Sequence, residues 1–250
     1  MATTRPAGRF RLRFERPPLV EAVCEFRFTD SSGWDWTVPG RLHERIRNAF
    51  PTVRQIRPRV VVVGMEPAPP VSNVERLHFA SADGTRLVQS GPNLLAINVL
   101  PPYPGWDQFC DLVLKIFGHH AKLVQAGPVA RVGLRYINRI GLGGRDAADL
   151  LCVLPELRSF FDASPTSFFE RYEIHYAEPP GALTYQAGDV AGPERALMID
   201  LDFWRESLDE VSPDALRRWL TAAHDRIEEV FVRSLSEKAR ALLGMREEPS

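Results

Sequence analysis

The sequence predicts an α+β protein in which two long helices cover one face of a curved antiparallel sheet. Segments such as residues 129–140 alternate apolar and polar side chains, as expected for strands with one buried side. Two longer segments, which begin near Trp106 and Ser212, carry apolar residues at three- and four-residue steps, as expected for amphipathic helices. Burying an apolar sheet face against apolar helix stripes gives a two-layer domain whose other sheet face stays open.

The first half of the chain begins with two predicted strands and a short helix. Residues 8–14 alternate arginine with apolar side chains, and residues 19–28 form a second apolar run. Pro39 is well placed to start a helix, and Pro51 ends it. The apolar face of this helix consists of Leu42, Ile46, Ala49 and Phe50.

Short strands precede the first long helix. β-branched residues predict a buried strand at 59–64, and the proline-rich loop after it cannot pair regularly. Three further strands, joined by turns that contain Gly84 and Asn93, are predicted near residues 75–80, 85–90 and 94–100. The stripe of the long helix consists of Trp106, Phe109, Cys110, Val113, Ile116, Phe117 and His120.

The second half repeats this order of elements. A long strand at 129–140 precedes a short helix near residues 146–154. Three strands follow, at residues 169–178, 182–188 and 195–204. Ser212 and Pro213 provide the last helix with an N-cap and a favoured first residue. Its apolar stripe consists of Leu216, Trp219, Leu220, Ala223, Ile227, Val230, Phe231 and Leu235.

The chain therefore divides into two similar α+β halves, residues 1–127 and 128–250, which we expect to form one compact unit. Each half runs strand, short helix, several antiparallel strands, long helix. No repeat is visible at the level of residues, so the duplication is inferred from element order alone. This order resembles the duplicated fold of the TATA-box-binding protein, in which two such units form one curved sheet backed by two long helices.

Composition is typical of a soluble globular protein. A formal net charge of −1 gives no long-range attraction to nucleic acid or to an acidic membrane. The three cysteines (Cys24, Cys110 and Cys152) are odd in number and widely spaced, which fits a reducing cytoplasm. The N-terminus lacks the apolar stretch of a secretory signal, and no segment approaches the roughly 20 apolar residues needed to span a bilayer. We therefore expect a cytoplasmic protein with no membrane contact.

Residues 90–109, SGPNLLAINVLPPYPGWDQF, hold the first candidate binding residues. On its predicted strand, Asn98 would cost about 1–3 kcal/mol if buried and unpaired. It therefore meets water or a ligand on the open face, or it pairs with backbone. Asn138 raises the same question in the second half. Tyr103 and Trp106 flank a Pro-Gly turn; they either pack a rigid loop onto the helix or form an edge that recognises a partner.

Three blocks of sequence also carry a family resemblance. They read PPLVEAVCEFRF, QSGPNLLAINVLPPYPGWDQF and GLRYINRI. Together they resemble a sporadically distributed bacterial family of about this length, and the resemblance extends over most of the chain. The family supplies no catalytic residues to carry over. Its patchy distribution implies an accessory protein from mobile or phage-defence-associated genes.

Sequence motifs argue against most catalytic classes. The chain has no GxSxG motif, no paired Cys/His signature and no phosphate loop. The glycine-rich residues 141–144 lie between a strand and a helix, where phosphate can bind. They lack the spacing and the downstream acid of a dinucleotide site, so we interpret them as a turn. No cofactor is expected.

One group of polar residues supports an alternative, enzymatic hypothesis. Asp200 and Asp202 share one face of a predicted strand, and Glu173 and His175 share one face of another. If the four converge, they form an oxygen-rich site with one imidazole, suited to a divalent cation in a hydrolase or nuclease. Polar residues on the solvated side of an amphipathic sheet explain the same pattern.

A row of arginines completes the candidate surface. Arg131, Arg135 and Arg139 share one strand face and can grip phosphates or an acidic partner. Nucleic-acid binding is a further alternative, although the basic net charge that favours it is absent. We predict a non-enzymatic binding or regulatory accessory protein that recognises a protein partner through its open sheet face. The predicted binding residues are Asn98, Tyr103, Trp106, Arg131, Arg135, Asn138 and Arg139; no metal ligand is predicted.

Overall fold

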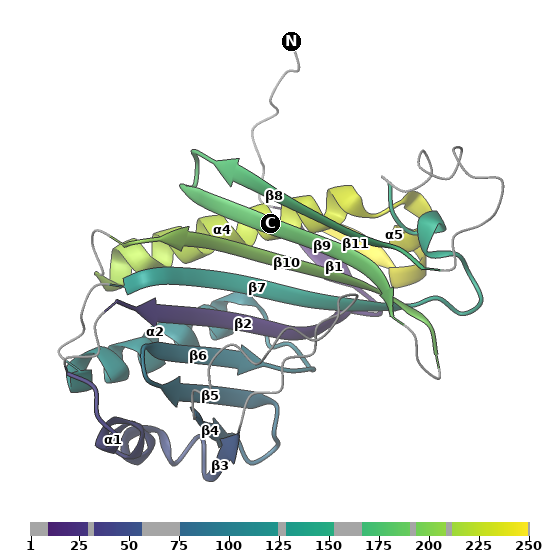
Figure 1. The fold of residues 1–250 in the computed structure, drawn as a ribbon. Coiled ribbons are helices and arrows are strands. Elements are labelled where there is room, and N and C mark those ends of the chain that lie inside the picture. Colours follow the sequence, from purple (N-terminus) through teal and green to yellow (C-terminus); the bar gives the residue numbers. More distant parts are fainter. Residues whose placement is uncertain are drawn as a thin grey trace.

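A single antiparallel sheet organises the protein. The computed structural model describes residues 10–29, 33–56, 76–124, 129–152, 167–190, 194–208 and 212–249. Within these ranges, nine strands form one sheet in the order β3-β4-β5-β6-β2-β7-β10-β9-β8, with the long helices on one side of it (Figure 1). The predicted α+β class, with helices packed on one face of an antiparallel sheet, is confirmed.

The order of elements in each half follows the prediction. The first half contains β2 (Leu19–Phe28), α1 (Thr37–Ile46), β3 (Thr52–Ile56), β4 (Arg76–Ala80), β5 (Arg86–Gly91), β6 (Leu94–Val99) and α2 (Trp106–Val124). The second half contains β7 (Val129–Gly141), the 3-10 helix η1 (Ala147–Asp149), β8 (Phe169–Tyr176), β9 (Gly181–Val190), β10 (Ala196–Glu206) and α4 (Pro213–Ser234). A separate two-stranded sheet joins β1 (Phe10–Phe14) to β11 (Met245–Pro249), which follows α5 (Glu237–Leu243).

The first strands of the two halves meet at the centre of the sheet. β2 pairs antiparallel with β7, so that Ala22 lies opposite Tyr136 and Cys24 opposite Leu134. β6 continues the sheet on the β2 side and β10 continues it on the β7 side. The two halves therefore share one sheet and one core, while the division at residue 127 stays a prediction.

The core lies between the sheet and the two long helices. Phe26 of β2 is fully buried and its ring lies 4.5 Å from the ring of Phe117 on α2. Phe203 of β10 is also fully buried and lies 5.9 Å from the ring of Trp219 on α4. Each helix thus covers the strands of its own half, as the apolar stripes predict.

Local sequence fixes the residue at which α4 begins. The Ser212 hydroxyl accepts a hydrogen bond of 3.2 Å from the backbone N–H of Ala215, and Pro213 occupies the first helical position. Ser236 caps α5 in the same way by accepting from the N–H of Ala239. The predicted N-cap of the last long helix is therefore present.

Several elements differ from the prediction or lie beyond the described residues. β3, α5 and β11 are not among the predicted elements, because each is only five to seven residues long. The short helix of the second half is, as far as it is described, one 3-10 turn at Ala147–Asp149, capped by the Asp146 carboxylate. The predicted strand at 59–64 and the loop after it lie outside the described residues.

None of the helices in the described ranges has both the length and the apolar character required to cross a bilayer.

We expect Phe26→Ala to lower the free energy of unfolding by about 3–5 kcal/mol, because it leaves a cavity between the sheet and α2. Val53→Ala, at a side chain that is 47% exposed, is the control and should change it by less than about 0.5 kcal/mol. Urea denaturation followed by circular dichroism measures both. Equal losses in the two variants would contradict this placement of the core.

Candidate functional site

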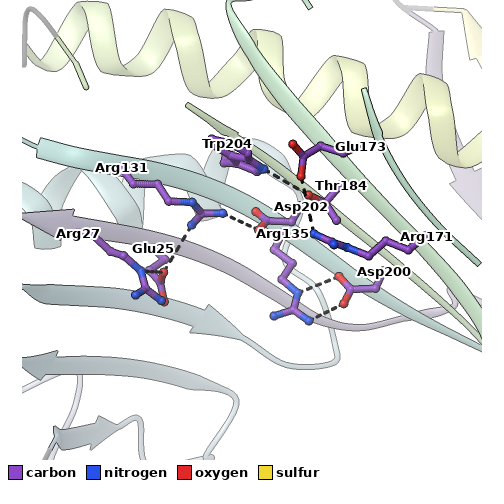
Figure 2. Close-up of polar contacts among 10 residues, drawn as sticks. All are labelled: Glu25, Arg27, Arg131, Arg135, Arg171, Glu173, Thr184, Asp200, Asp202 and Trp204. Carbon is purple, nitrogen blue, oxygen red and sulfur yellow. Dashed lines mark hydrogen bonds and ion pairs between the residues drawn. The ribbon is translucent and has the colours of Figure 1, made fainter. Parts of the chain in front are cut away.

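Charged side chains occupy the sheet face opposite the helices. We call this the open face and define it by Glu25 on β2, Arg131 and Arg135 on β7, and Asp200 and Asp202 on β10. These positions alternate with fully buried residues of the same strands, so they point to the other side of the sheet. Figure 2 shows their side chains converging from three neighbouring strands. We refer to these five residues, together with Arg27, as the arginine–carboxylate array.

An open polar hollow of about 310 Å³ lies beside the array, over β7, β10, β9 and β8. It is lined by Arg131, Arg135, Arg171, Glu173, Thr184, Gln186, Asp202 and Trp204. Three guanidinium groups therefore reach this hollow, and two carboxylates line it with them.

Arg131 links three strands of the array. Its Nη2 lies 2.7 Å from Oδ2 of Asp202 on β10, and its Nη1 lies 3.5 Å from Oε1 of Glu25 on β2. The Glu25 oxygen also accepts a 2.7 Å hydrogen bond from Nε of Arg27. Opposite charges on adjacent strands stabilise a sheet face, and hydrogen bonds between ionised groups are the stronger ones.

The Arg131 contact depends on a glycine. In the register of β7 and β10, Asp202 lies opposite Arg135 and not opposite Arg131, so the Arg131 side chain must cross Gly133 to reach it. A Cβ on Gly133 would lie 3.0 Å from both Arg131 Nη1 and Asp202 Oδ1. The guanidinium also lies 5.3 Å from the ring of Trp204, which faces Gly133 across the strands. Gly133 thus makes room for the ion pair.

Arg135 forms a bidentate contact with Asp200. Its Nε donates a 2.8 Å hydrogen bond to Oδ1, and its Nη2 donates to Oδ2. This hydrogen bonding to Asp200 raises the pKa of Arg135 above its ordinary value. The Arg135 side chain is 45% exposed, whereas that of Asp200 is 16% exposed. The guanidinium is therefore held in a fixed orientation but remains accessible to a partner.

Burial sets the electrostatics of Asp202. Desolvation raises the pKa of this carboxyl above its ordinary value, although Arg131 acts in the opposite direction. Arg131 and Asp202 have side chains that are about one quarter exposed, at 25% and 23%. The pair therefore lies between a solvated surface ion pair and a buried one.

The outer side of the hollow is formed by β9 and β8. The indole Nε1 of Trp204 donates a 3.2 Å hydrogen bond to Oγ1 of Thr184. On β8, Nη2 of Arg171 lies 3.7 Å from Oε2 of Glu173, and both side chains are exposed. These contacts fix the Trp204 ring and leave the β8 side chains in solvent.

The alternative metal site is not assembled as hypothesised. Asp200 and Asp202 are each bonded to an arginine, which supplies the positive charge that a cation would supply. Oε1 of Glu173 lies 3.5 Å from Nε2 of His175, and both residues are on β8. Among the described residues, which include all four, no group of three His, Cys, Asp or Glu side chains is arranged to hold a metal ion.

Asn98 is buried and paired, but with side chains and not with backbone or solvent. Its Nδ2 donates a 2.6 Å hydrogen bond to Oε1 of Glu21, and its Oδ1 accepts a 3.0 Å hydrogen bond from Nε2 of Gln89. The residue is only 4% exposed. The structure thus gives Asn98 a role in joining β5, β6 and β2, which neither sequence alternative included.

Asn138 and Arg139 lie on opposite faces of β7. Asn138 follows the buried side of the strand, is 5% exposed, and donates from Nδ2 to the Ile199 carbonyl at 3.3 Å. It therefore pairs with backbone, which is one of the two outcomes expected for these asparagines, and does not reach the open face. Arg139 is exposed and its Nη2 donates to the Glu194 carbonyl at 3.1 Å.

Tyr103 and Trp106 lie on the helix side of the sheet. The Trp106 ring stacks on His224 of α4 at 4.3 Å, and the Tyr103 hydroxyl lies 3.1 Å from the hydroxyl of Tyr136. The Tyr136 hydroxyl in turn lies 2.8 Å from Nδ1 of His224. The two aromatic residues therefore pack a loop between α2 and α4, and the sheet separates them from the arginine–carboxylate array.

Sequence reasoning missed several residues of the array and the hollow. Glu25, Gly133 and Trp204 are not among the residues predicted from the sequence, and Glu25 and Trp204 carry no local signal beyond their place in an alternating strand. A glycine inside a strand is a known sign of close approach by another group, so Gly133 was the available signal. Nothing in the local sequence marks Thr184 or Gln186.

The fold and the site together define an α+β protein that presents a charged, hollowed surface on one side of its sheet. No family model matches the chain, and no curated protein matches its sequence. Its function must therefore be argued from the surface itself.

We expect Arg131→Met to lower the free energy of unfolding by about 1–3 kcal/mol, because it leaves the partly buried carboxylate of Asp202 without its cation. The matched control is Arg27→Met, at a side chain that is 55% exposed, and it should change stability by less than about 1 kcal/mol. Thermal or urea unfolding of both variants provides the comparison. A larger loss in the Arg27 variant would show that Arg131 does not organise the array.

We expect His224 to contribute a loss of stability as the pH falls below about 6.5. Burial lowers the pKa of His224 from an ordinary value of about 6.5 to about 3. Between pH 6.5 and pH 3 the unfolded chain therefore binds a proton that the folded chain excludes. This costs about 2 kcal/mol between pH 6.5 and pH 5. Urea unfolding across this range should show a smaller loss for His224→Gln than for the unmodified protein.

His175→Gln is the control for this measurement, because the His175 side chain is 75% exposed. It should keep the full pH dependence. Glu228, whose Oε1 lies 3.5 Å from Nε2 of His224, acts in the opposite direction, because burial raises its pKa to about 7. Repeating the comparison in a Glu228→Gln background separates the two groups. Identical slopes for the His224 variant and the unmodified protein would mean that His224 is not held neutral.

Proposed function

We propose that this protein is a non-enzymatic binding protein that recognises a protein partner through the open face of its sheet. The observation that carries the proposal is the arginine–carboxylate array, which crosses β2, β7 and β10 and borders the hollow at Trp204. Its side chains are held in place by one another and face solvent, so they need little ordering when a partner binds.

The composition of the surface favours a protein over a nucleic acid. Arginines and carboxylates are paired on this face, as Arg27, Arg131, Arg135 and Arg171 with Glu25, Glu173, Asp200 and Asp202 (Figure 2). Binding to a phosphate backbone draws on uncompensated positive charge, whereas these charges are matched. A protein surface that carries both signs of charge complements such an array and gains specificity from it.

The residues at the hollow are of the types that dominate binding energy in protein interfaces. Arginine and tryptophan are enriched among such residues. Arg135 uses Nε and Nη2 for Asp200, and a guanidinium has five N–H donors in all. Trp204 presents its indole beside Arg131. We therefore place the centre of the interface at Arg135 and Trp204.

We further propose that the protein acts in the cytoplasm as an accessory or regulatory component, in keeping with the family that its sequence resembles. All three cysteines of the chain lie in the described part of the structure as free thiols, and Cys152 is exposed. Free thiols of this kind are typical of a reducing compartment.

The test uses the affinity-tagged full-length protein as bait in an extract of the cells that express it. A captured protein is then purified and its dissociation constant is measured directly. We expect Arg135→Ala to weaken binding at least tenfold, which corresponds to about 1.4 kcal/mol. Higher ionic strength should slow association, because charged surfaces steer encounter.

The matched control is Arg218→Ala, at an exposed arginine of α4 on the helix side of the sheet. It should bind as the unmodified protein does. If folded Arg135 and Trp204 variants bind the captured partner with unchanged affinity, the open face is not the interface. If the unmodified protein captures nucleic acid from the extract, and high salt abolishes this capture, the nucleic-acid alternative is supported instead.

A further inference from the structure

Among the described residues, β8 is the last strand of the sheet. Within the described residues β8 pairs only with β9, and it pairs there without interruption from Phe169 to Tyr176. Figure 1 shows it at the margin of the sheet. Proteins usually protect such an edge with proline, charged side chains, a bulge or a covering segment, because its unpaired backbone groups can bind another strand. The sequence FERYEIHY contains no proline, and its outward-pairing charged residues, Arg171 and Glu173, are of opposite sign.

β8 also exposes apolar surface. Phe169, Tyr172 and Ile174 are 51%, 45% and 37% exposed, and they are three of the five large hydrophobic residues that are exposed in the described part of the chain. Phe169 lies on the open face beside Gly188, whereas Tyr172 lies on the helix side against Tyr185. Both faces of this edge strand therefore have side chains that a neighbouring strand can cover.

The direction of the backbone groups limits how another strand can pair. The backbone N–H of Asp189 on β9 donates to the Phe168 carbonyl at 3.3 Å, so the Phe168 backbone faces β9. In an antiparallel ladder the direction alternates with each residue. The outward backbone groups are therefore those of Phe169, Arg171, Glu173 and His175.

We propose that β8 pairs antiparallel with β8 of a second copy of this chain, about a twofold axis at Tyr172. This register sets outward-facing residues opposite one another, as the hydrogen-bond pattern requires. It also places Arg171 opposite Glu173 of the second copy, and Glu173 opposite Arg171, so that two ion pairs form. Registers centred on Arg171 or on Glu173 set like charges against each other, which is unfavourable.

The same register brings the exposed apolar residues together. Tyr172 meets Tyr172 of the second copy as a non-hydrogen-bonded pair, the closer type of cross-strand pair, and aromatic pairs of this kind stabilise sheets. Phe169 meets His175. The occupant is a second copy because the charge pattern of β8, Arg171 followed by Glu173, is complementary to itself when one strand is reversed.

Pairing of this kind joins two sheets into one and brings two hollows together. Arg171 and Glu173 line the hollow as well as the outer edge of β8. The two hollows therefore lie on either side of the twofold axis, and the second copy of the chain lies next to the β8 side of each hollow. This pairing does not depend on the proposed recognition of a different protein, because that interface is centred on Arg135 and Trp204.

Charge reversal tests the proposal. The unmodified protein should sediment as a dimer of twice 28.2 kDa, and Arg171→Glu and Glu173→Arg should each give monomers. An equimolar mixture of the two single variants should form a heterodimer, because acids on one strand then face arginines on the other. The double variant Arg171→Glu/Glu173→Arg should dimerise again. Both side chains are exposed, so circular dichroism should show every variant folded.

Three results would overturn the proposal: an unmodified protein that is monomeric at about 100 µM, far above the dissociation constant of a specific dimer; a dimer that survives both single reversals; or a mixture of the single variants that remains monomeric. None of these results bears on the Arg135 binding test, so the two proposals fail separately.

A cysteine pair tests the register. In a Cys152→Ser background, which removes the exposed native thiol, Tyr172→Cys should form a disulfide-linked dimer under mild oxidation. Non-hydrogen-bonded pairs have Cα atoms about 4.5 Å apart, within the range that a disulfide spans. Ile174→Cys is the control and should not cross-link, because it faces Glu170 of the second copy. Equal cross-linking of the two variants, or none with Tyr172→Cys, would contradict this register.

Discussion

The strict alternation of side chains along β7 is the constraint on which the rest of the structure depends. Leu134 is fully buried under the helices, and the next residue, Arg135, faces solvent and binds Asp200. A shift of one residue in the pairing with β2 or β10 would bury the guanidinium and expose the leucine. The hydrophobic core therefore fixes the register, and the register places each arginine within reach of its carboxylate. Core and surface array have the same physical origin.

The two layers of the protein carry different chemistry. Between sheet and helices, burial keeps polar groups neutral: it lowers the pKa of His224 to about 3 and raises the pKa of Tyr103 above its ordinary value. On the open face, guanidinium and carboxylate groups remain charged because each has a partner and part of its surface in water. Tyr103 and Trp106 belong to the first layer, so their contribution is to hold α2 against α4.

Elements with a strong period were predictable, and elements that depend on a distant partner were not. The stripes of α2 and α4 and the alternation of β2, β7 and β10 appear in the chain itself. β11 has no such pattern: its Met245 pairs with Phe14, at the other end of the chain. The same limit applies to Asn98. Its strand could be anticipated, but not its burial or its hydrogen bonds to Glu21 and Gln89.

Local sequence by itself determined the strongly periodic elements, the buried side of their strands, and the presence of charged residues on the other side, because these follow from periods of 2.0 and 3.6 residues. Only the tertiary structure decided that Arg131 crosses Gly133 to reach Asp202, that Trp204 borders a hollow, and that β8 lies at the edge. The Arg131 and Asp202 side chains are 71 positions apart in the chain. Their contact depends on strand order, which is set by how all the strands pack on one helix layer and not by any short stretch of residues.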